Sequence, residues 1–284
     1  MLSLGVIFAI ISFLGWGVAD FLAKRVVDKI GALWSLLIMQ IIGIVPIVIY
    51  SLLFLKIPLL SLQMLGILAL SSFLLIFAYL IFYKAIKYGP ISIVSPIAAS
   101  GSAITILISV LFFAEALTLA QALAIAVIFL GVVLVSVKWN KSSKKVFASY
   151  GALLALFTML GWGFAFPLMK INMNVIGPVF TLLLVRFFSI VFLSIYSSRQ
   201  NRPVIDNSKV WLYLITIGLV DAFAFLAYYI GVSMDYLSII SPVSSSYPAV
   251  TIILAYIFLK ERVQNIQKIG IVLILLGLIL ISVI

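Results

Sequence analysis

Long apolar segments follow one another along almost the whole chain, and only short polar stretches separate them. Each segment is longer than a buried strand requires and is close to the length of about 20 residues with which a helix crosses a bilayer. The pattern predicts an all-α polytopic membrane protein with ten transmembrane helices. The predicted spans are residues 2–23, 31–55, 60–83, 90–113, 119–137, 147–169, 176–197, 209–232, 237–259 and 266–284.

The composition agrees with this pattern and excludes several classes of protein. Of the 284 residues, 66% are hydrophobic and 9% are charged, which is too few charges for the surface of a water-soluble domain. The chain has no Cys and no His, which excludes disulfides, Ser-His-Asp catalysis and the common zinc and haem sites. No nucleotide-binding loop is found. We therefore expect no catalytic residue, no metal and no cofactor.

Basic residues outnumber acidic residues by 18 to 7 and occur as small groups between the apolar segments. This spread argues against a nucleic-acid partner, which needs basic residues gathered on one surface. Fifteen of them fall on one side of the predicted bundle, Lys56 and Lys170 fall on the other, and Arg186 lies within a span. Because Lys and Arg are retained in the cytoplasm, the fifteen predict that both termini are extracytoplasmic in a plasma-membrane protein.

The sequence repeats itself at an offset of 146 residues. Residues 5–24 and 151–170 share nine identities in twenty positions, and residues 82–136 and 228–282 share eighteen in fifty-five, without a gap. The repeat predicts two units, residues 1–145 and 146–284. The rarer residue types that recur are Gly15-Trp16-Gly17 as Gly161-Trp162-Gly163, Lys24 as Lys170, Ser95-Pro96 as Ser241-Pro242, and Glu115 as Glu261.

Each unit holds five predicted spans, and because five is odd the second unit must enter the membrane upside down relative to the first. The basic residues agree with this inversion. Lys84 and Lys87 of the first unit correspond to Ile230 and Ser233 of the second. Two inverted halves can exchange conformations and open a midplane site to either side of the membrane. The repeat therefore favours a transporter over a receptor, a scaffold or a channel.

These elements resemble the drug/metabolite transporter superfamily in its EamA branch. The resemblance rests on the Gly-Trp-Gly of the first helix in each half, the Ser-Pro that starts the fourth, and the Glu that closes it. It covers essentially the whole chain. It implies a basket-like bundle around a central cavity and the export or exchange of small metabolites such as amino acids. It does not imply one substrate.

Charged residues within the hydrocarbon are costly, so each one is a functional candidate. Arg186 and Asp221 lie at similar depth in two consecutive spans, where Arg186 would receive a substrate carboxylate or phosphate and Asp221 would neutralise it in the empty state. A structural ion pair is the alternative. Asp20 and Asp221 are candidates for proton coupling, and for Asp20 the alternative is an interfacial pair with Lys24 at i+4.

Hydroxyl and aromatic side chains near the middle of the spans are predicted to line the cavity. Glu115 and Glu261 fall at span ends, where a hydrogen-bonding role at a helix end is expected instead. The predicted substrate-binding residues are Arg186, Asp221, Trp16, Trp162, Tyr79, Tyr83, Ser95, Tyr228, Ser241, Ser245 and Tyr247.

The sequence predicts a secondary active transporter of a small polar metabolite that works by alternating access within the lipid bilayer, with protons as a possible coupling ion. Two rivals remain at this point. A flippase of lipid carriers or lipid-linked sugars would need a cavity that opens laterally between helices. An intramembrane enzyme would need clustered polar catalytic groups, whereas the three intramembrane charges are scattered along the sequence.

Overall fold

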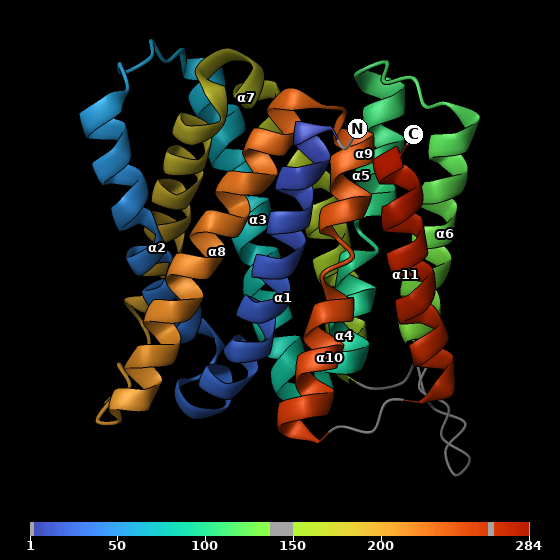
Figure 1. Cartoon of the computed structure of the whole chain (residues 1–284). Helices are drawn as coiled ribbons and strands as arrows, with labels where there is room; N and C mark the ends of the chain where they lie inside the picture. The colour runs from blue at the N-terminus through green and yellow to red at the C-terminus, as the bar shows by residue number, and fades with distance from the viewer. Residues whose placement is uncertain (1–2, 137–149, 261–263, 284) are drawn as a thin grey trace.

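The computed structural model describes residues 3–136, 150–260 and 264–283, and all regular secondary structure in these ranges is helical (Figure 1). The high content of Leu, Ile, Ala and Phe gives each helix an apolar surface that lipid or a neighbouring helix can cover. The helices are α1 (Leu4–Ile30), α2 (Ala32–Phe54), α3 (Leu62–Tyr88), α4 (Ile91–Ala99), α5 (Ser102–Phe112), α6 (Leu119–Ser136), α7 (Tyr150–Ser197), α8 (Ser208–Met234), α9 (Leu237–Ser244), α10 (Pro248–Leu259) and α11 (Asn265–Val283).

Most of these helices are long and apolar enough to cross a membrane. Seven stretches of the described residues meet that criterion when α4 and α5 are taken together, α9 and α10 are taken together, and α7 is counted once. Two further apolar helices are shorter, over Leu119–Leu134 and Asn265–Gly277. The protein is therefore a multi-pass helical membrane protein.

The 48-residue helix α7 contains a break at Gly177, where φ is +76° and ψ is 167°. Gly31, which separates α1 from α2, has almost the same torsion angles, with φ +81° and ψ 165°. A positive φ is readily accessible only to glycine, so each Gly lets one helix end and the next begin without a loop. The two glycines are 146 residues apart in the sequence.

Three helices extend well beyond their predicted ends, and one of them, predicted over residues 147–169, continues to the break at Gly177. The first helix of the chain was expected to end at residue 23 but continues to Ile30, and the third helix of the chain was expected to end at 83 but continues to Tyr88. The predicted spans end just before the first basic residues, Lys24 and Lys84. Lys and Arg are good helix formers, however, and their long side chains reach polar surroundings without interrupting the helix. The helix ends follow Gly31 and Gly89 instead.

The helices form one bundle in which α1 begins and α11 ends at the same end, and α7 bends over at that end too (Figure 1). Three pairs of helices pack most extensively: α3 with α7, α1 with α8, and α6 with α11, which stand together at one edge of the bundle. The first helix of the second unit therefore packs on the first unit, and the first helix of the first unit packs on the second.

The close approaches between helices also come in pairs that are related by the offset of 146 residues. A Cβ atom added at Gly17 would lie 2.5 Å from Cβ of Val250, and one added at Gly163 would lie 2.7 Å from Cβ of Ile104. Real Cβ atoms do not approach so closely, so both sites need glycine. In each such pair the two contacting residues exchange halves. The contact of Gly15 with Ala224 corresponds to that of Gly161 with Ala78. Likewise, the contact of Gly131 with Ile274 corresponds to that of Gly277 with Ile128.

Two hydrogen bonds reinforce these close contacts in the same paired manner. Thr251 Oγ1 donates to the carbonyl of Gly17, and Thr105 Oγ1 donates to the carbonyl of Gly163, both at 3.2 Å. Side-chain hydroxyls that reach a neighbouring backbone are a common means of joining helices inside a membrane. These bonds fix the Gly-Trp-Gly segment of α1 against α10, and the Gly-Trp-Gly segment of α7 against α5.

Adding one methyl group at either paired glycine is expected to loosen this interface. Gly17→Ala and Gly163→Ala should each lower the free energy of unfolding by about 1–3 kcal/mol, because the new Cβ overpacks a filled contact. Gly66→Ala is the matched control, since no described atom lies within 4 Å of its added Cβ. Thermal unfolding of the purified protein in detergent measures the effect. Identical melting temperatures for all three variants and the parent would contradict this packing.

Candidate functional site

A cavity lies at the centre of the bundle. Two interrupted helices, α4 with α5 and α9 with α10, have their breaks here and meet the first helices of both halves, α1 and the first part of α7. The space between the atoms of the cavity wall, counted together with its opening, amounts to about 390 Å³. Its wall is mostly aromatic, with one carboxylate. The lining residues are Trp16, Asp20, Tyr79, Ala98, Ala99, Gly101, Ser102, Trp162, Phe166, Phe225, Ser245 and Tyr247.

Each interrupted helix tightens at its break. Between α4 and α5 the amide of Gly101 donates to the carbonyl of Ala98, three residues back, at 3.2 Å. Between α9 and α10 the amide of Tyr247 likewise donates to the carbonyl of Ser244, at 3.3 Å. A proline lies shortly before each break, at Pro96 and Pro242, where it cannot donate a helical hydrogen bond. These short turns bring small and hydroxyl-bearing residues to the cavity.

Two tryptophans at repeat-related positions form opposite parts of the aromatic wall. The Trp16 ring lies 4.9 Å from that of Phe225 and 5.3 Å from that of Tyr228, between ring centroids. The Trp162 ring lies 5.0 Å from that of Tyr79. Tilted and edge-on contacts of this kind hold the rings in place. The indole Nε1 atoms of both tryptophans are buried and have no hydrogen-bond partner in the described part of the chain.

Asp20 is the charged residue in this wall. Its side chain lies on α1 one turn after Trp16 and is 5% exposed, and its Oδ2 atom has no hydrogen-bond partner among residues 3–136, 150–260 and 264–283. The interfacial pair with Lys24, considered as its alternative role, does not form. Lys24 lies 3.3 Å from Asp28 instead. Because α1 continues past its predicted end, Lys24 can extend towards the helix end and its polar surroundings, and not back into the core.

Arg186 and Asp221 form a buried ion pair next to the cavity, as their similar depth predicted. Arg186 Nη2 donates to Asp221 Oδ2 at 2.7 Å, and Nη1 donates to Oε1 of Gln40 at 2.6 Å. The Tyr79 hydroxyl donates to the other oxygen of Asp221 at 3.1 Å. The guanidinium also lies 5.7 Å from the ring centre of Phe225. Neither Arg186 nor Asp221 is part of the cavity wall. The pair contacts two residues of that wall, Tyr79 and Phe225.

Sequence reasoning missed Gln40, although a signal for it was present. Gln40 is a buried amide near the middle of the apolar helix α2, where a polar side chain needs a partner inside the protein. That requirement could have linked it to Arg186, whose guanidinium carries more donors than one carboxylate can accept.

The predicted site residues divide into two groups. Trp16, Tyr79, Trp162, Ser245 and Tyr247 line the cavity. Tyr83, Ser95, Tyr228 and Ser241 are buried beside it and are not part of its wall. The Tyr83 hydroxyl, for example, donates to the sulfur of Met39 at 2.8 Å. Ser95 offers its backbone carbonyl to the Tyr247 hydroxyl at 3.5 Å. Helical spacing alone could not say which face of a buried helix meets the cavity.

Several wall residues were not among the predicted binding residues. Phe166 could have been found, because it is the repeat counterpart of Asp20. Ser102 lines the cavity although Ser95, seven residues before it, does not, because the break between α4 and α5 separates the two. The small residues Ala98, Ala99 and Gly101 carry no chemical signal in the sequence. They line the cavity only because α4 ends there.

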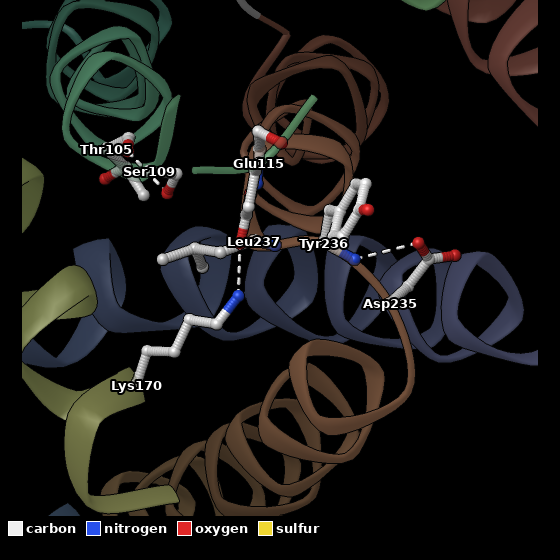
Figure 2. A network of polar contacts seen from close by, with 8 residues as sticks. Thr105, Ser109, Glu115, Lys170, Asp235, Tyr236 and Leu237 are labelled. Carbon is white, nitrogen blue, oxygen red and sulfur yellow. Dashed lines mark hydrogen bonds and ion pairs between the residues drawn. The ribbon is translucent and has the colours of Figure 1, made fainter. Parts of the chain in front are cut away.

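A second polar cluster lies at the end of the bundle where α1 begins (Figures 1 and 2). Glu115, in the connection between α5 and α6, forms an ion pair with Lys170 of α7. Its two carboxylate oxygens also accept the first backbone N–H groups of α9, from Leu237 at 3.0 Å and from Ser238 at 2.8 Å. Glu115 of the first half therefore caps a helix of the second half, in keeping with the helix-end role expected for it. Glu261 lies outside the described residues.

Burial and hydrogen bonding act on Glu115 in opposite directions. Burial raises the pKa of its carboxyl group, whereas the Lys170 ammonium and the backbone N–H of Ser238 lower it. The net result is a pKa below the ordinary value of 4.5, because three donors converge on the ionised form. The ionised carboxylate therefore stabilises the contact between the two halves at neutral pH.

Comparisons with known proteins point to one family. The EamA-like transporter family matches the chain twice, over residues 3–137 and 149–283. An uncharacterized protein of Methanocaldococcus jannaschii is 34% identical over 122 residues, which cover 43% of this chain and 88% of that protein. A solved protein crystal structure superposes with a TM-score of 0.75 over 98% of this chain and 96% of that one, at 15% identity, which shows a shared fold alone.

Neutralising Glu115 is expected to weaken the fold at neutral pH and to have little effect in acid. Glu115→Gln should lower the free energy of unfolding by about 1–3 kcal/mol at pH 7, because Lys170 then loses its charged partner inside the protein. The folded pKa is lower than the unfolded one, so this stabilisation is present above pH 4.5 and is lost as the pH falls through the folded pKa. Thermal unfolding as a function of pH measures the difference.

The exposed residue Asp206 provides the control for this experiment, because Asp206→Asn removes one negative charge from a polar connection without disturbing a buried contact. Its unfolding curve should match that of the parent at every pH. A Glu115→Gln variant as stable as the parent at pH 7, or one whose deficit grows in acid, would contradict the role assigned to Glu115.

Proposed function

The chain belongs to the EamA-like transporter family and is a multi-pass membrane transporter, and from this premise we propose that it is a secondary active transporter of a small polar metabolite such as an amino acid. In this proposal it works as an exporter or exchanger by alternating access. The observation that carries the proposal is the central cavity, which lies between helices of both halves and whose lining residues include buried polar atoms without partners in the described part of the chain. A pathway through a membrane needs such groups to replace water around a polar substrate.

In this proposal ten spans form two inverted units, residues 1–145 and 146–284. The break at Gly177 divides α7 into two helices with the same torsion angles that separate α1 from α2 at Gly31. Counting α4 with α5 and α9 with α10 then gives five spans for each half. The two family matches begin 146 residues apart, and the M. jannaschii relative is about half as long as this chain. Both observations favour a duplicated five-helix unit, which is inverted because five is odd.

The exchange of contacts between the halves supports alternating access. A contact from α1 to the second half has a counterpart from α7 to the first half, as in the pairs Gly17–Val250 and Gly163–Ile104. If two halves make equivalent contacts, each can adopt the conformation that the other now has, and the cavity then opens to the opposite side. A flippase would need a cavity that opens laterally between helices into the lipid, and none of the residues that line the described cavity favours such an opening.

In the transport cycle Arg186 and Asp221 are proposed to respond to the substrate. The two guanidinium Nη groups donate hydrogen bonds to Gln40 and to Asp221. The Nε atom of Arg186 has no hydrogen-bond partner among the described residues, and in this proposal it is the donor that a substrate carboxylate reaches. Asp20 and Asp221 are the proposed sites for a coupling proton, because a carboxylate inside the membrane can change its charge during the cycle.

Transport should depend on these charges. In proteoliposomes that contain the purified protein, Arg186→Gln and Asp221→Asn are each expected to reduce amino-acid counterflow by about tenfold or more, since a buried charged contact is worth about 2 kcal/mol or more. Asp206→Asn is the control at an exposed position. An imposed pH gradient should change the rate in the parent but not in Asp20→Asn. Unchanged counterflow in both charge variants at equal protein levels would contradict the proposed role of the pair.

The proposed topology places both termini outside the cytoplasm in the plasma membrane. The basic ends of α1 and α3, with Lys24, Arg25, Lys84 and Lys87, lie at the opposite end of the bundle from the start of α1 (Figure 1). The positive-inside rule then assigns that opposite end to the cytoplasm. A reporter enzyme that is active only outside the cytoplasm should be active when it is fused after Ile284. A fusion that is active only in the cytoplasm would overturn this topology.

A further inference from the structure

Three atoms in the cavity wall are buried and lack a hydrogen-bond partner within the described residues: Oδ2 of Asp20, and Nε1 of Trp16 and Trp162. Buried polar atoms in folded proteins nearly always have partners, so each exception needs an explanation. All three belong to side chains that line one cavity, which brings one acceptor and two donors to the same site.

The charges around the cavity leave Asp20 without a counter-ion. Arg186 is paired with Asp221, Lys170 with Glu115, and Lys24 with Asp28. The cavity wall itself, as far as the described residues form it, contains no Lys or Arg. Asp20 is therefore the one carboxyl group in the wall that these residues form, and when it is ionised it has no basic partner there. A buried unpaired carboxylate is unfavourable, and a cationic ligand would remove that cost by supplying the missing partner.

The remaining wall is suited to the same kind of ligand. Trp16, Tyr79, Trp162, Phe225 and Tyr247 contribute aromatic rings to the cavity. Aromatic faces are negative, so rings grouped around one site attract an ammonium group through cation–π interactions. They would repel an anion. The carboxylate and the rings therefore favour the same sign of charge on the ligand.

We propose that the central cavity binds the ammonium group of an organic amine, with Asp20 as its counter-ion. The surrounding rings hold the cationic head, and the indole N–H groups of Trp16 and Trp162 donate to an uncharged oxygen on the same ligand. The proposal rests on the proposed transport function only in taking the cavity as the substrate site. It narrows the substrate class, because the carboxylate of an amino acid finds no cation in the wall, whereas an amine, or an amino-acid derivative without a carboxylate, needs none.

Three probes that share one side chain show whether the cavity recognises the ammonium group, the carboxylate or both. Phenylalanine amide keeps the ammonium without a carboxylate, phenylalanine carries both groups, and N-acetylphenylalanine keeps only the carboxylate. Leucine amide, leucine and N-acetylleucine repeat the comparison with an aliphatic side chain. Binding is measured by calorimetry on the purified full-length protein in nanodiscs at pH 7. We expect the amides to bind about tenfold or more tightly than the amino acids, and the N-acetyl compounds to show no binding.

Variants of the protein test the assigned groups. Asp20→Asn should reduce amide binding about tenfold or more, whereas Asp28→Asn should leave it unchanged. Asp28 is the matched control because it lies on the same helix, with its side chain 49% exposed. Trp162→Leu should weaken binding roughly 3-fold to 30-fold, and Trp162→Phe, which keeps an aromatic ring, should weaken it less.

A second measurement does not depend on any ligand. Because Asp20 is an unpaired buried carboxylate, Asp20→Asn should melt at the same temperature as the empty parent protein or at a higher one. A lower melting temperature would mean that Asp20 is a structural partner, and it would overturn the proposal. Equal affinity of Asp20→Asn and the parent for the amides would overturn it too, as would tighter binding of the amino acids or the N-acetyl compounds.

This binding experiment and the transport experiment can fail separately. Amide binding that depends on Asp20, together with an absence of counterflow for any solute, would leave the cavity assignment intact and reject the proposed transport cycle. Counterflow of compounds that lack an amine, at a rate independent of Asp20, would retain the transporter and reject the amine as its substrate.

Discussion

The interior of a bilayer offers no hydrogen-bond partners, and this constraint explains most of the polar organisation of the structure. Each charge that enters the bundle must find its partner within the protein. The two Nη groups of Arg186 donate to Gln40 and Asp221, and Asp221 also accepts from Tyr79. Every one of these contacts joins different helices, so the same interactions that make the charges tolerable also fix how the helices pack. Asp20 differs from these residues, because its carboxyl group forms no ion pair within the described residues and its Oδ2 atom accepts no hydrogen bond there.

A second feature follows from the duplicated sequence. The two halves do not pack as separate domains, since α1 lies against α8 and α7 lies against α3. The Gly-Trp-Gly segment serves two purposes in each half. Its glycines allow close contact with the broken helix of the other half, as at Gly17 and Val250, while its tryptophan is directed into the cavity. The packing of the halves and the lining of the site therefore depend on the same three residues. Glu115 and Lys170 add a charged contact between the halves at one end of the bundle.

The sequence predicted the helical membrane fold and the pairing of Arg186 with Asp221, because hydrophobic length and the cost of buried charge act locally and do not depend on the details of packing. It could not predict which buried residues meet the cavity. Tyr79 and Tyr83 share a helix face, yet Tyr79 lines the cavity and Tyr83 bonds to Met39, since the break between α4 and α5 decides where space remains. It also allowed Lys24 as a partner for Asp20. Only the continuation of α1 to Ile30, with Asp28 at the next turn, removes that partner.

The central claim is that Asp20 provides the counter-ion for a cationic ligand in a cavity formed by both halves. The most direct test is a structure of the protein determined with phenylalanine amide bound. The account predicts that the ammonium nitrogen lies within hydrogen-bonding distance of the Asp20 carboxylate, between the rings of Trp16 and Trp162. A ligand whose ammonium group lies away from Asp20, or one bound outside this cavity, would contradict it.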